Sequence, residues 1–199
     1  MKARDNPFGA SRVLAAIRFV RPDDDGRGAT AASLLPRLAA LGHRAAIVGP
    51  HGSGKTTLLE DLEGLLAARG FRVCHVRLDT LDRRLPQAWR ARAGRLDAGD
   101  VVCLDGAEQL GAIRWCWFRW SARRAGGLII TSHRPGRLPA LIACTTSASL
   151  LAGIIERLGP PPLAGAPSAA ELFICHRGNL RDALRDLYDL YARVSLPGR

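Results

Sequence analysis

Short apolar runs alternate along this chain with longer segments whose apolar residues recur at helical spacing. Such runs are typical of buried strands, and the segments with apolar residues three or four positions apart are typical of helices. The alternation predicts an α/β protein in which helices form two layers around a parallel, five-stranded sheet. The predicted strands are 45–48, 71–78, 101–105, 128–131 and 141–144. The predicted helices are 30–41, 58–69, part of 80–98, 109–124, 149–158, 168–175 and 179–194.

The same pattern divides the chain into three parts. Residues 1–29 are a polar lead with a short apolar segment, Val13 to Val20, and residues 30–160 hold all of the predicted strands. Residues 161–199 hold the last two helices, and the stretch before them is rich in proline and glycine. We therefore expect a sheet-containing core followed by a small helical appendage.

The predicted helix at 109–124 is unusually aromatic. Its apolar residues fall on more than one side. Four of them share one face at helical spacing, and this face is predicted to pack on the core. Two further aromatic residues lie to the side of it and are predicted to mark a partner surface. The core set is Leu110, Ile113, Trp117 and Trp120, and the side pair is Trp115 and Phe118.

Charge adds a basic character to this picture, because the formal net charge is +11. No acidic residue lies between Glu108 and Glu156, whereas several arginines do. A basic face of this kind suits nucleic acid, acidic lipid or an acidic patch on a protein. Nothing in the sequence matches a nucleic-acid-binding motif, so solvated arginine surfaces are the favoured interpretation. Trp89, which lies among arginines, is predicted to anchor a surface helix, with base stacking as the alternative.

Cysteine usage and hydropathy favour a cytoplasmic protein. The five cysteines are scattered, without a C-x-x-C pair, which is typical of buried thiols in a reducing compartment. No apolar signal-peptide segment follows Met1. The uncharged stretch from Leu138 to Ile155 is long enough for a membrane span, but Pro139 and Gly153 interrupt it. A short strand and an amphipathic helix are therefore predicted there.

The strongest chemical signal is the stretch from Gly49 to Thr56, which matches G-x-x-x-x-G-K-[ST] between a predicted strand and a predicted helix. Glycines let successive backbone N–H groups turn inward around an anion, and a helix N-terminus adds partial positive charge. Lys55 would meet the β- and γ-phosphates of a nucleotide, and the Thr56 hydroxyl would bind Mg²⁺. The chain contains only two lysines, and Lys55 is one of them. Arginine provides all of the other strongly basic side chains.

A second signal is Asp105, which ends the apolar run 101–105. A carboxylate at the carboxyl end of a strand beside the phosphate loop can hold Mg²⁺ through water. Glu108 follows three residues later and is a candidate to polarise an attacking water. Its alternative role is that of a solvated acid at the start of the next helix, where negative charge is favourable.

These motifs resemble the P-loop NTPases of the additional-strand type, close to the AAA+ and STAND (NACHT-like) ATPases. The resemblance covers about residues 30–195. Gly49–Thr56 resembles Walker A, and residues 101–108 resemble Walker B with the NACHT-type variant Asp105-Gly106-Ala107-Glu108. Residues 128–135 resemble the sensor 1 strand, and Gly178-Asn179-Leu180-Arg181 resembles a lid motif whose arginine, sensor 2, reaches the nucleotide.

The resemblance implies a three-layer fold with strand order 5-1-4-3-2, a small C-terminal helical lid, bound Mg-ATP and a hydrolysis-driven switch. Ser132, His133 and Arg134 are all open as the sensor 1 residue. Gly106 stands where AAA+ proteins usually place the catalytic glutamate, so the resemblance implies ATP binding more directly than hydrolysis. Lys55 and Glu108 are the candidate catalytic residues, and Thr56 and Asp105 the candidate Mg²⁺ ligands. The candidate nucleotide-binding residues are Gly49, Pro50, His51, Gly52, Ser53, Gly54, Lys55, Thr56, Thr57, Ser132 and Arg181.

These residues are compatible with three alternative functions. The first is a slow ATPase that acts as a switch for an unidentified protein partner. The second is a small-molecule kinase of the nucleotide type, whose opening residues are similar from Gly49 to Phe71. The third is a module that binds nucleotide without hydrolysing it and recruits a partner.

Overall fold

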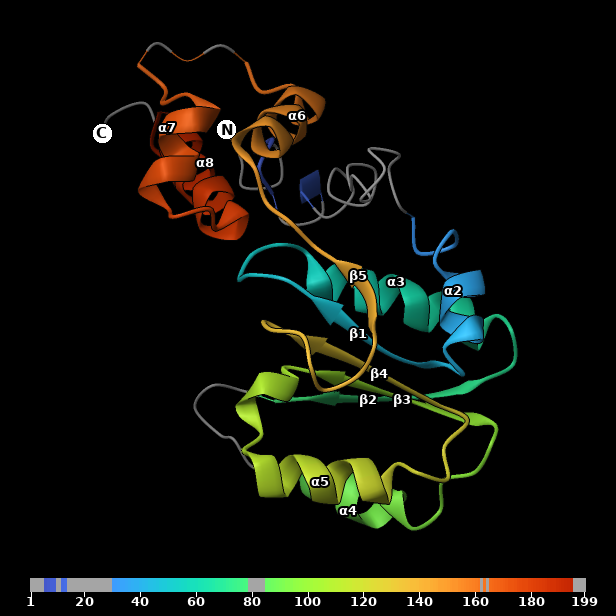
Figure 1. Ribbon diagram of the computed structural model, residues 1–199. Coiled ribbons are helices and arrows are strands. Elements are labelled where there is room, and N and C mark those ends of the chain that lie inside the picture. The colour runs from blue at the N-terminus through green and yellow to red at the C-terminus, as the bar shows by residue number, and fades with distance from the viewer. Residues whose placement is uncertain are drawn as a thin grey trace. The chain divides into compact units, whose positions relative to one another are not determined.

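The computed structural model describes residues 6–9, 12–13, 30–78, 85–161, 163 and 165–194. The chain divides into two compact units (Figure 1). The sheet unit comprises Ala29–Gly49 and Lys55–Cys144. The helical unit comprises Met1–Gly28, Pro50–Gly54 and Thr145–Arg199. Apart from Val13, the predicted apolar segment Val13 to Val20 lies outside the described residues.

The sheet unit contains a five-stranded sheet in the order β2-β3-β4-β1-β5, and every neighbouring pair is parallel. Read from the other edge, this is the predicted order 5-1-4-3-2, so the α/β class, the parallel sheet and the strand order are confirmed. The three central strands are buried on both faces, which is why they are continuous apolar runs in the sequence. The strands are β1 Arg44–Val48, β2 Arg72–Arg77, β3 Asp100–Asp105, β4 Gly127–Ser132 and β5 Ala140–Ala143.

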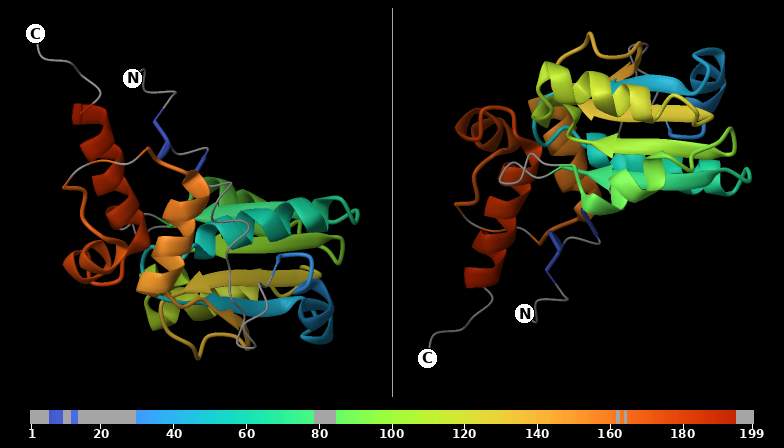
Figure 2. Two further views of the ribbon diagram at one scale, coloured as in Figure 1. Left: turned by 90° about the horizontal axis from the view of Figure 1, so that it is seen from above. Right: turned by 90° about the horizontal axis from the view of Figure 1, so that it is seen from below.

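Helices cover both faces of this sheet (Figure 1), and the views from above and from below look onto the two helix-covered faces (Figure 2). Two helices, α2 (Leu35–Ala40) and α3 (Lys55–Ala67), pack on one face, and α4 (Gln87–Ala93) and α5 (Ala112–Ser121) pack on the other. Alternate residues of each strand serve the two cores, as the two-residue period of a strand requires. In β3, for example, Cys103 packs with the first layer and Leu104 with the second.

The predicted core face of α5 is wrong. Ile113, Trp117 and Trp120 are 87%, 43% and 61% exposed, while Trp115 and Phe118 are buried at 8% and 0%. Both sets recur at helical spacing and both contain aromatic residues, so periodicity alone could not choose between them. The sheet-facing side continues into small side chains, which let the helix approach the strands closely. These small residues are Ser121, Ala122 and Ala125, all buried.

Leu110 alone of the predicted core set is buried, at 1% exposure, and it precedes α5 at the end of a 3₁₀ turn, η2 (Ala107–Gln109). Trp89 anchors α4, as predicted: it is 2% exposed and stacks on Phe118 with ring centroids 4.5 Å apart. Trp89, Trp115 and Phe118 therefore belong to one buried cluster on this face of the sheet.

The helical unit has its own core, built from α6 (Ala148–Leu158), α7 (Ala169–Cys175) and α8 (Leu180–Val194). Ser168 caps α7 through a capping box with Glu171. Asn179 caps α8, since its Oδ1 accepts hydrogen bonds from the backbone N–H groups of Arg181 and Asp182. The apolar stripe of α8 is buried at Leu180, Leu184, Leu187 and Tyr191.

One contributor to this core was not predicted. Phe8, from the polar N-terminal lead, is 3% exposed and lies 5.2 Å from the ring of Tyr191. Asn6 fixes the same segment, because its side chain donates a hydrogen bond to the backbone carbonyl of Tyr188. An isolated phenylalanine in a polar segment gives no periodic signal, so the pattern of apolar residues missed it.

The uncharged stretch from Leu138 to Ile155 folds as predicted, with β5 followed by the amphipathic helix α6. Among the described residues, none of the helices is both long and apolar enough to cross a bilayer. All five cysteines are free thiols. Three of them are buried, and Cys116 and Cys175 are exposed.

Candidate functional site

The glycine loop, which we define as residues 49–54, links the carboxyl end of β1 to the first residue of α3, Lys55. Gly52 and Gly54 have φ angles of +72° and +79°, with Ser53 between them. Residues with side chains rarely adopt this left-handed conformation, which explains why glycine occupies both positions. Alternation of this kind turns successive backbone N–H groups toward one side and forms a concavity that suits an anion.

Lys55 is buried at 8% exposure, although it is charged. Its ammonium group donates a hydrogen bond of 2.8 Å to the carbonyl oxygen of Gly49, the residue at which the loop begins. The backbone N–H of Gly49 in turn donates to the carbonyl of Ser132, at the end of β4. The lysine is therefore held against the backbone at the carboxyl end of the sheet.

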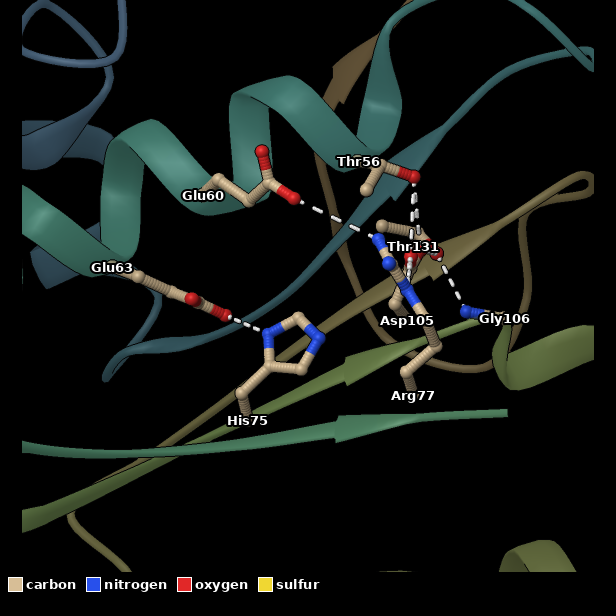
Figure 3. Close-up of polar contacts among 8 residues, drawn as sticks. All are labelled: Thr56, Glu60, Glu63, His75, Arg77, Asp105, Gly106 and Thr131. Carbon is tan, nitrogen blue, oxygen red and sulfur yellow. Dashed lines mark hydrogen bonds and ion pairs between the residues drawn. The ribbon is translucent and has the colours of Figure 1, made fainter. Parts of the chain in front are cut away.

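Asp105 is the centre of a hydrogen-bond network at the same end of the sheet (Figure 3). The Thr56 hydroxyl lies 3.1 and 3.3 Å from its two carboxylate oxygens. The Thr131 hydroxyl donates to Oδ1 at 2.7 Å and accepts a hydrogen bond from the backbone N–H of Gly106. Three elements, α3, β3 and β4, thus contribute to the position of one carboxylate, whose side chain is 13% exposed.

A cation from β2 completes this network. Arg77 Nε donates to Asp105 Oδ2 at 3.2 Å, and its Nη2 lies 3.6 Å from a carboxylate oxygen of Glu60 on α3. Two residues earlier on β2, His75 Nδ1 lies 2.6 Å from Glu63 Oε1 (Figure 3). The Asp105 carboxylate is therefore shared between two hydroxyl groups and a guanidinium group.

Glu108 lies on η2, directly after β3. Its Oε1 is 3.3 Å from His133 Nε2, whereas its Oε2 is buried without a hydrogen-bond partner. Arg137 adds a positive charge to this cluster; burial lowers the pKa of its guanidinium group, and the charge of Glu108 opposes that shift. One carboxylate oxygen of Glu108 thus contacts the imidazole of His133, and the other accepts no hydrogen bond.

Among the three candidates for sensor 1, the side chains take different roles. Ser132 is 3% exposed, and its hydroxyl donates to the backbone carbonyl of Arg134, so it closes a local turn. His133 contacts Glu108, and Arg134 is exposed. The side chain that contacts Asp105 comes from Thr131, one position earlier.

The remaining predicted loop and helix residues are positioned as follows. Pro50 and His51 are exposed, and Thr57 is buried in the first turn of α3 at 7% exposure. The Ser53 hydroxyl donates a hydrogen bond to the carbonyl of Pro50, which ties the loop across itself.

Within the helical unit, Gly52 lies against the N-terminus of α8. A Cβ atom at Gly52 would overlap Asn179 Oδ1 and would lie 3.1 Å from the backbone nitrogen of Arg181. The same Oδ1 atom caps the helix. Arg181, the predicted lid arginine, lies two positions after Asn179, the residue that contacts the glycine loop. Arg181 itself is exposed.

Sequence reasoning missed Thr131 and Arg77 as members of this network. The role of Thr131 follows from the register of the folded sheet, because β3 and β4 pair up to Leu104 and Ile130, which makes Asp105 and Thr131 the next pair. The sequence gives no signal for Arg77, which is one arginine among many in a basic chain. Its role depends on β2 lying beside β3, which becomes visible only in the folded sheet.

The contact between Gly52 and Asn179 generates a prediction. Gly52→Ala should lower the stability of the protein, because the methyl group would overlap Asn179 and the left-handed backbone would cost about 1–2 kcal/mol by itself. The measurement is the free energy of unfolding from denaturant titration. Gly64→Ala is the matched control: Gly64 lies in α3 with open space around it, so alanine there should be neutral or stabilising. Equal stability of Gly52→Ala and wild type would contradict the close approach.

The chain was also compared with protein-family models and with curated proteins. It shows no significant match to any family model or to any curated protein. We therefore infer the function of this protein from the geometry and chemistry of the site alone.

Proposed function

We propose that this protein binds Mg-ATP through a P-loop and hydrolyses it slowly, as a switch for a protein partner. The observation that carries the proposal is the hydrogen bond between the Thr56 hydroxyl and the Asp105 carboxylate. A hydroxyl that follows the loop lysine and a carboxylate at a neighbouring strand end are the two protein groups with which P-loop NTPases hold Mg²⁺. Here they come from residues 49 positions apart in the sequence.

Phosphate binding is assigned to the glycine loop and Lys55. The φ angles of Gly52 and Gly54 support an inward turn of the loop amides, and the N-terminus of α3 adds partial positive charge. Lys55 Nζ already donates a hydrogen bond at the loop. On binding of a triphosphate, its ammonium group would exchange the Gly49 carbonyl for a phosphate oxygen.

The residues present fit Mg²⁺ in the manner of a nucleotide site. Among the described residues, no cluster of three or more histidine, cysteine or acidic side chains could hold a metal without help. Mg²⁺ in phosphate-transfer sites typically takes one or two protein oxygens and completes its shell with water and phosphate oxygens. Thr56 and Asp105 would be these protein ligands. Bound there, the ion neutralises charge on the phosphate oxygens.

Glu108 is assigned the role of general base. Its unused carboxylate oxygen, Oε2, has the capacity to accept a hydrogen bond from water, and its contact with His133 orients the carboxyl group. The same contact favours a second candidate function, a nucleotide-binding module without hydrolysis, because the His133 imidazole already occupies one of the two carboxylate oxygens of Glu108. Which of the two applies depends on whether ATP turns over.

Arg181 is assigned to nucleotide sensing. Its backbone lies beside Gly52, so the start of α8 and the glycine loop are in van der Waals contact within the helical unit. A change in loop conformation on ATP binding would be transmitted to α8 through Asn179. We propose that this contact couples the nucleotide state to the helices that a partner would recognise.

The first prediction concerns binding. Lys55→Ala should weaken Mg-ATP binding by about tenfold to a hundredfold or more, the effect of losing charge-assisted hydrogen bonds worth about 1.5–3 kcal/mol. Calorimetric titration measures the affinity, and thermal unfolding checks that the variant folds. Lys2→Ala, which removes the only other lysine, is the control and should bind as wild type does. An unchanged affinity for Lys55→Ala would refute the assignment.

The second prediction concerns turnover. Wild type should release phosphate from ATP without an added acceptor, and Glu108→Gln should reduce the rate by about a hundredfold or more with little change in ATP affinity. Release by Glu108→Gln at the wild-type rate would exclude Glu108 as the base. ATP binding without release by wild type would favour the non-hydrolysing module, and transfer to a nucleoside monophosphate would favour a kinase.

The third prediction concerns Arg77, whose guanidinium group shares the Asp105 carboxylate that Mg²⁺ would use. Arg77→Gln should lower the Mg²⁺ concentration needed for half-maximal ATP binding by about twofold to fivefold, as expected for a partly exposed ion pair. The control is His75→Gln, on the same face of β2, which should leave the Mg²⁺ requirement unchanged. A higher Mg²⁺ requirement for Arg77→Gln would show instead that Arg77 orients Asp105 for the metal.

A further inference from the structure

The outward side of α5 carries large apolar side chains that the fold does not use. We call Ile113, Trp117 and Trp120 the outer stripe of α5; they are 87%, 43% and 61% exposed. Their spacing of four and three residues places them along one side of the helix. The sheet-facing side is filled by Trp115 and Phe118, and the outer stripe is not part of the buried cluster on this face of the sheet. Exposed aromatic groups gathered on one helix face are typical of binding surfaces.

The helix layer that carries the outer stripe is strongly basic. Neither α4 nor α5 contains an acidic residue. The acids that follow α4, Asp97 and Asp100, are paired with Arg72 on β2, and Asp100 also lies 3.6 Å from Arg92 of α4. The exposed arginines of the two helices and of the turns that follow them are Arg90, Arg92, Arg95, Arg114, Arg119, Arg123 and Arg124. In this layer the arginines therefore outnumber the acidic residues.

One arginine shows how the two kinds of side chain combine. The guanidinium carbon of Arg123 lies 3.9 Å from the centre of the Trp120 ring, and its Nη1 donates to the Trp120 carbonyl. An indole and a guanidinium group are thus presented as a stacked pair. Both groups are planar and stack on nucleobases, and the guanidinium group also binds phosphate.

We propose that the outer stripe of α5 binds single-stranded nucleic acid, with bases stacked on Trp117 and Trp120 and phosphates contacted by the neighbouring arginines. Positive charge along the backbone path and aromatic platforms for the bases are the two features that such binding requires. A duplex would fit less well, because its bases are stacked on one another and present only their edges.

Charge also decides against a second copy of this chain as the occupant. The copy would bring the same arginines to the interface, in a protein whose formal net charge is +11. An acidic protein segment would also satisfy the arginines, and the test below distinguishes it from nucleic acid. Nucleic acid satisfies both kinds of group, and all but two of the 29 basic residues of the chain are arginine, the cation that stacks.

The test uses the full chain and a fluorescein-labelled single strand of mixed sequence, about 16 nucleotides long, the upper site size of a single binding domain. Anisotropy measures binding and tryptophan fluorescence reports stacking. Wild type should bind with quenching of its tryptophan emission, and log K should fall with log salt at a slope of about −2 to −4 for three to five phosphate contacts. The double variant Trp117→Ala/Trp120→Ala should bind at least about tenfold more weakly and lose the quenching.

Two controls separate this surface from other effects. Ile174→Ala removes an exposed apolar side chain of α7 in the helical unit and should bind as wild type does. Trp117→Phe/Trp120→Phe keeps aromatic faces and should retain most of the affinity. Lys55→Ala should also leave this binding intact, so that failure of this inference and failure of the proposed ATP site are distinguishable.

Three results would overturn the inference. The first is no binding of the single strand at low salt. The second is equal binding to a duplex or to polyglutamate without tryptophan quenching, which would indicate a general polyanion surface or an acidic protein partner. The third is unchanged affinity in the double tryptophan-to-alanine variant.

Discussion

The hydrogen bonds that converge on the Asp105 carboxylate connect the parts of the site to one another. Thr56 reaches it from the start of α3, Thr131 from β4 and Arg77 from β2. These elements are far apart in the sequence, and only a parallel sheet with the order β2-β3-β4-β1-β5 brings their ends to one edge. A largely buried carboxylate that lacked these donors would be costly, so the geometry of the sheet and that of α3 are mutually dependent.

The sequence was sufficient to predict those structural roles that follow from a local pattern of residues. The central strands are apolar on both faces because they are covered on both sides, and their runs predicted β1, β3 and β4. The motif from Gly49 to Thr56 predicted a turn with unusual backbone angles, and Gly52 and Gly54 have them. Asn179 is a good N-cap by its chemistry, and it caps α8.

The sequence was not sufficient to predict roles that depend on which face of a helix or strand packs against a neighbouring element. The aromatic side chains of α5 offered two stripes at helical spacing, and the small residues from Ser121 onward decided which one packs on the sheet. Arg77 and Thr131 join Asp105 only through strand neighbours. The approach of Gly52 to Asn179 joins residues 127 positions apart by number, which no local pattern encodes. The outer stripe of α5 became a candidate binding surface only after this correction.

We propose that the glycine loop, Lys55, Thr56 and Asp105 together bind Mg-ATP. A crystal structure with Mg²⁺ and a slowly hydrolysed ATP analogue tests this most directly. We expect the triphosphate against the loop amides, with the Lys55 ammonium on a phosphate oxygen and Mg²⁺ bonded to the Thr56 hydroxyl. A nucleotide bound elsewhere, or a loop whose concavity is filled by the chain's own side chains, would contradict the account.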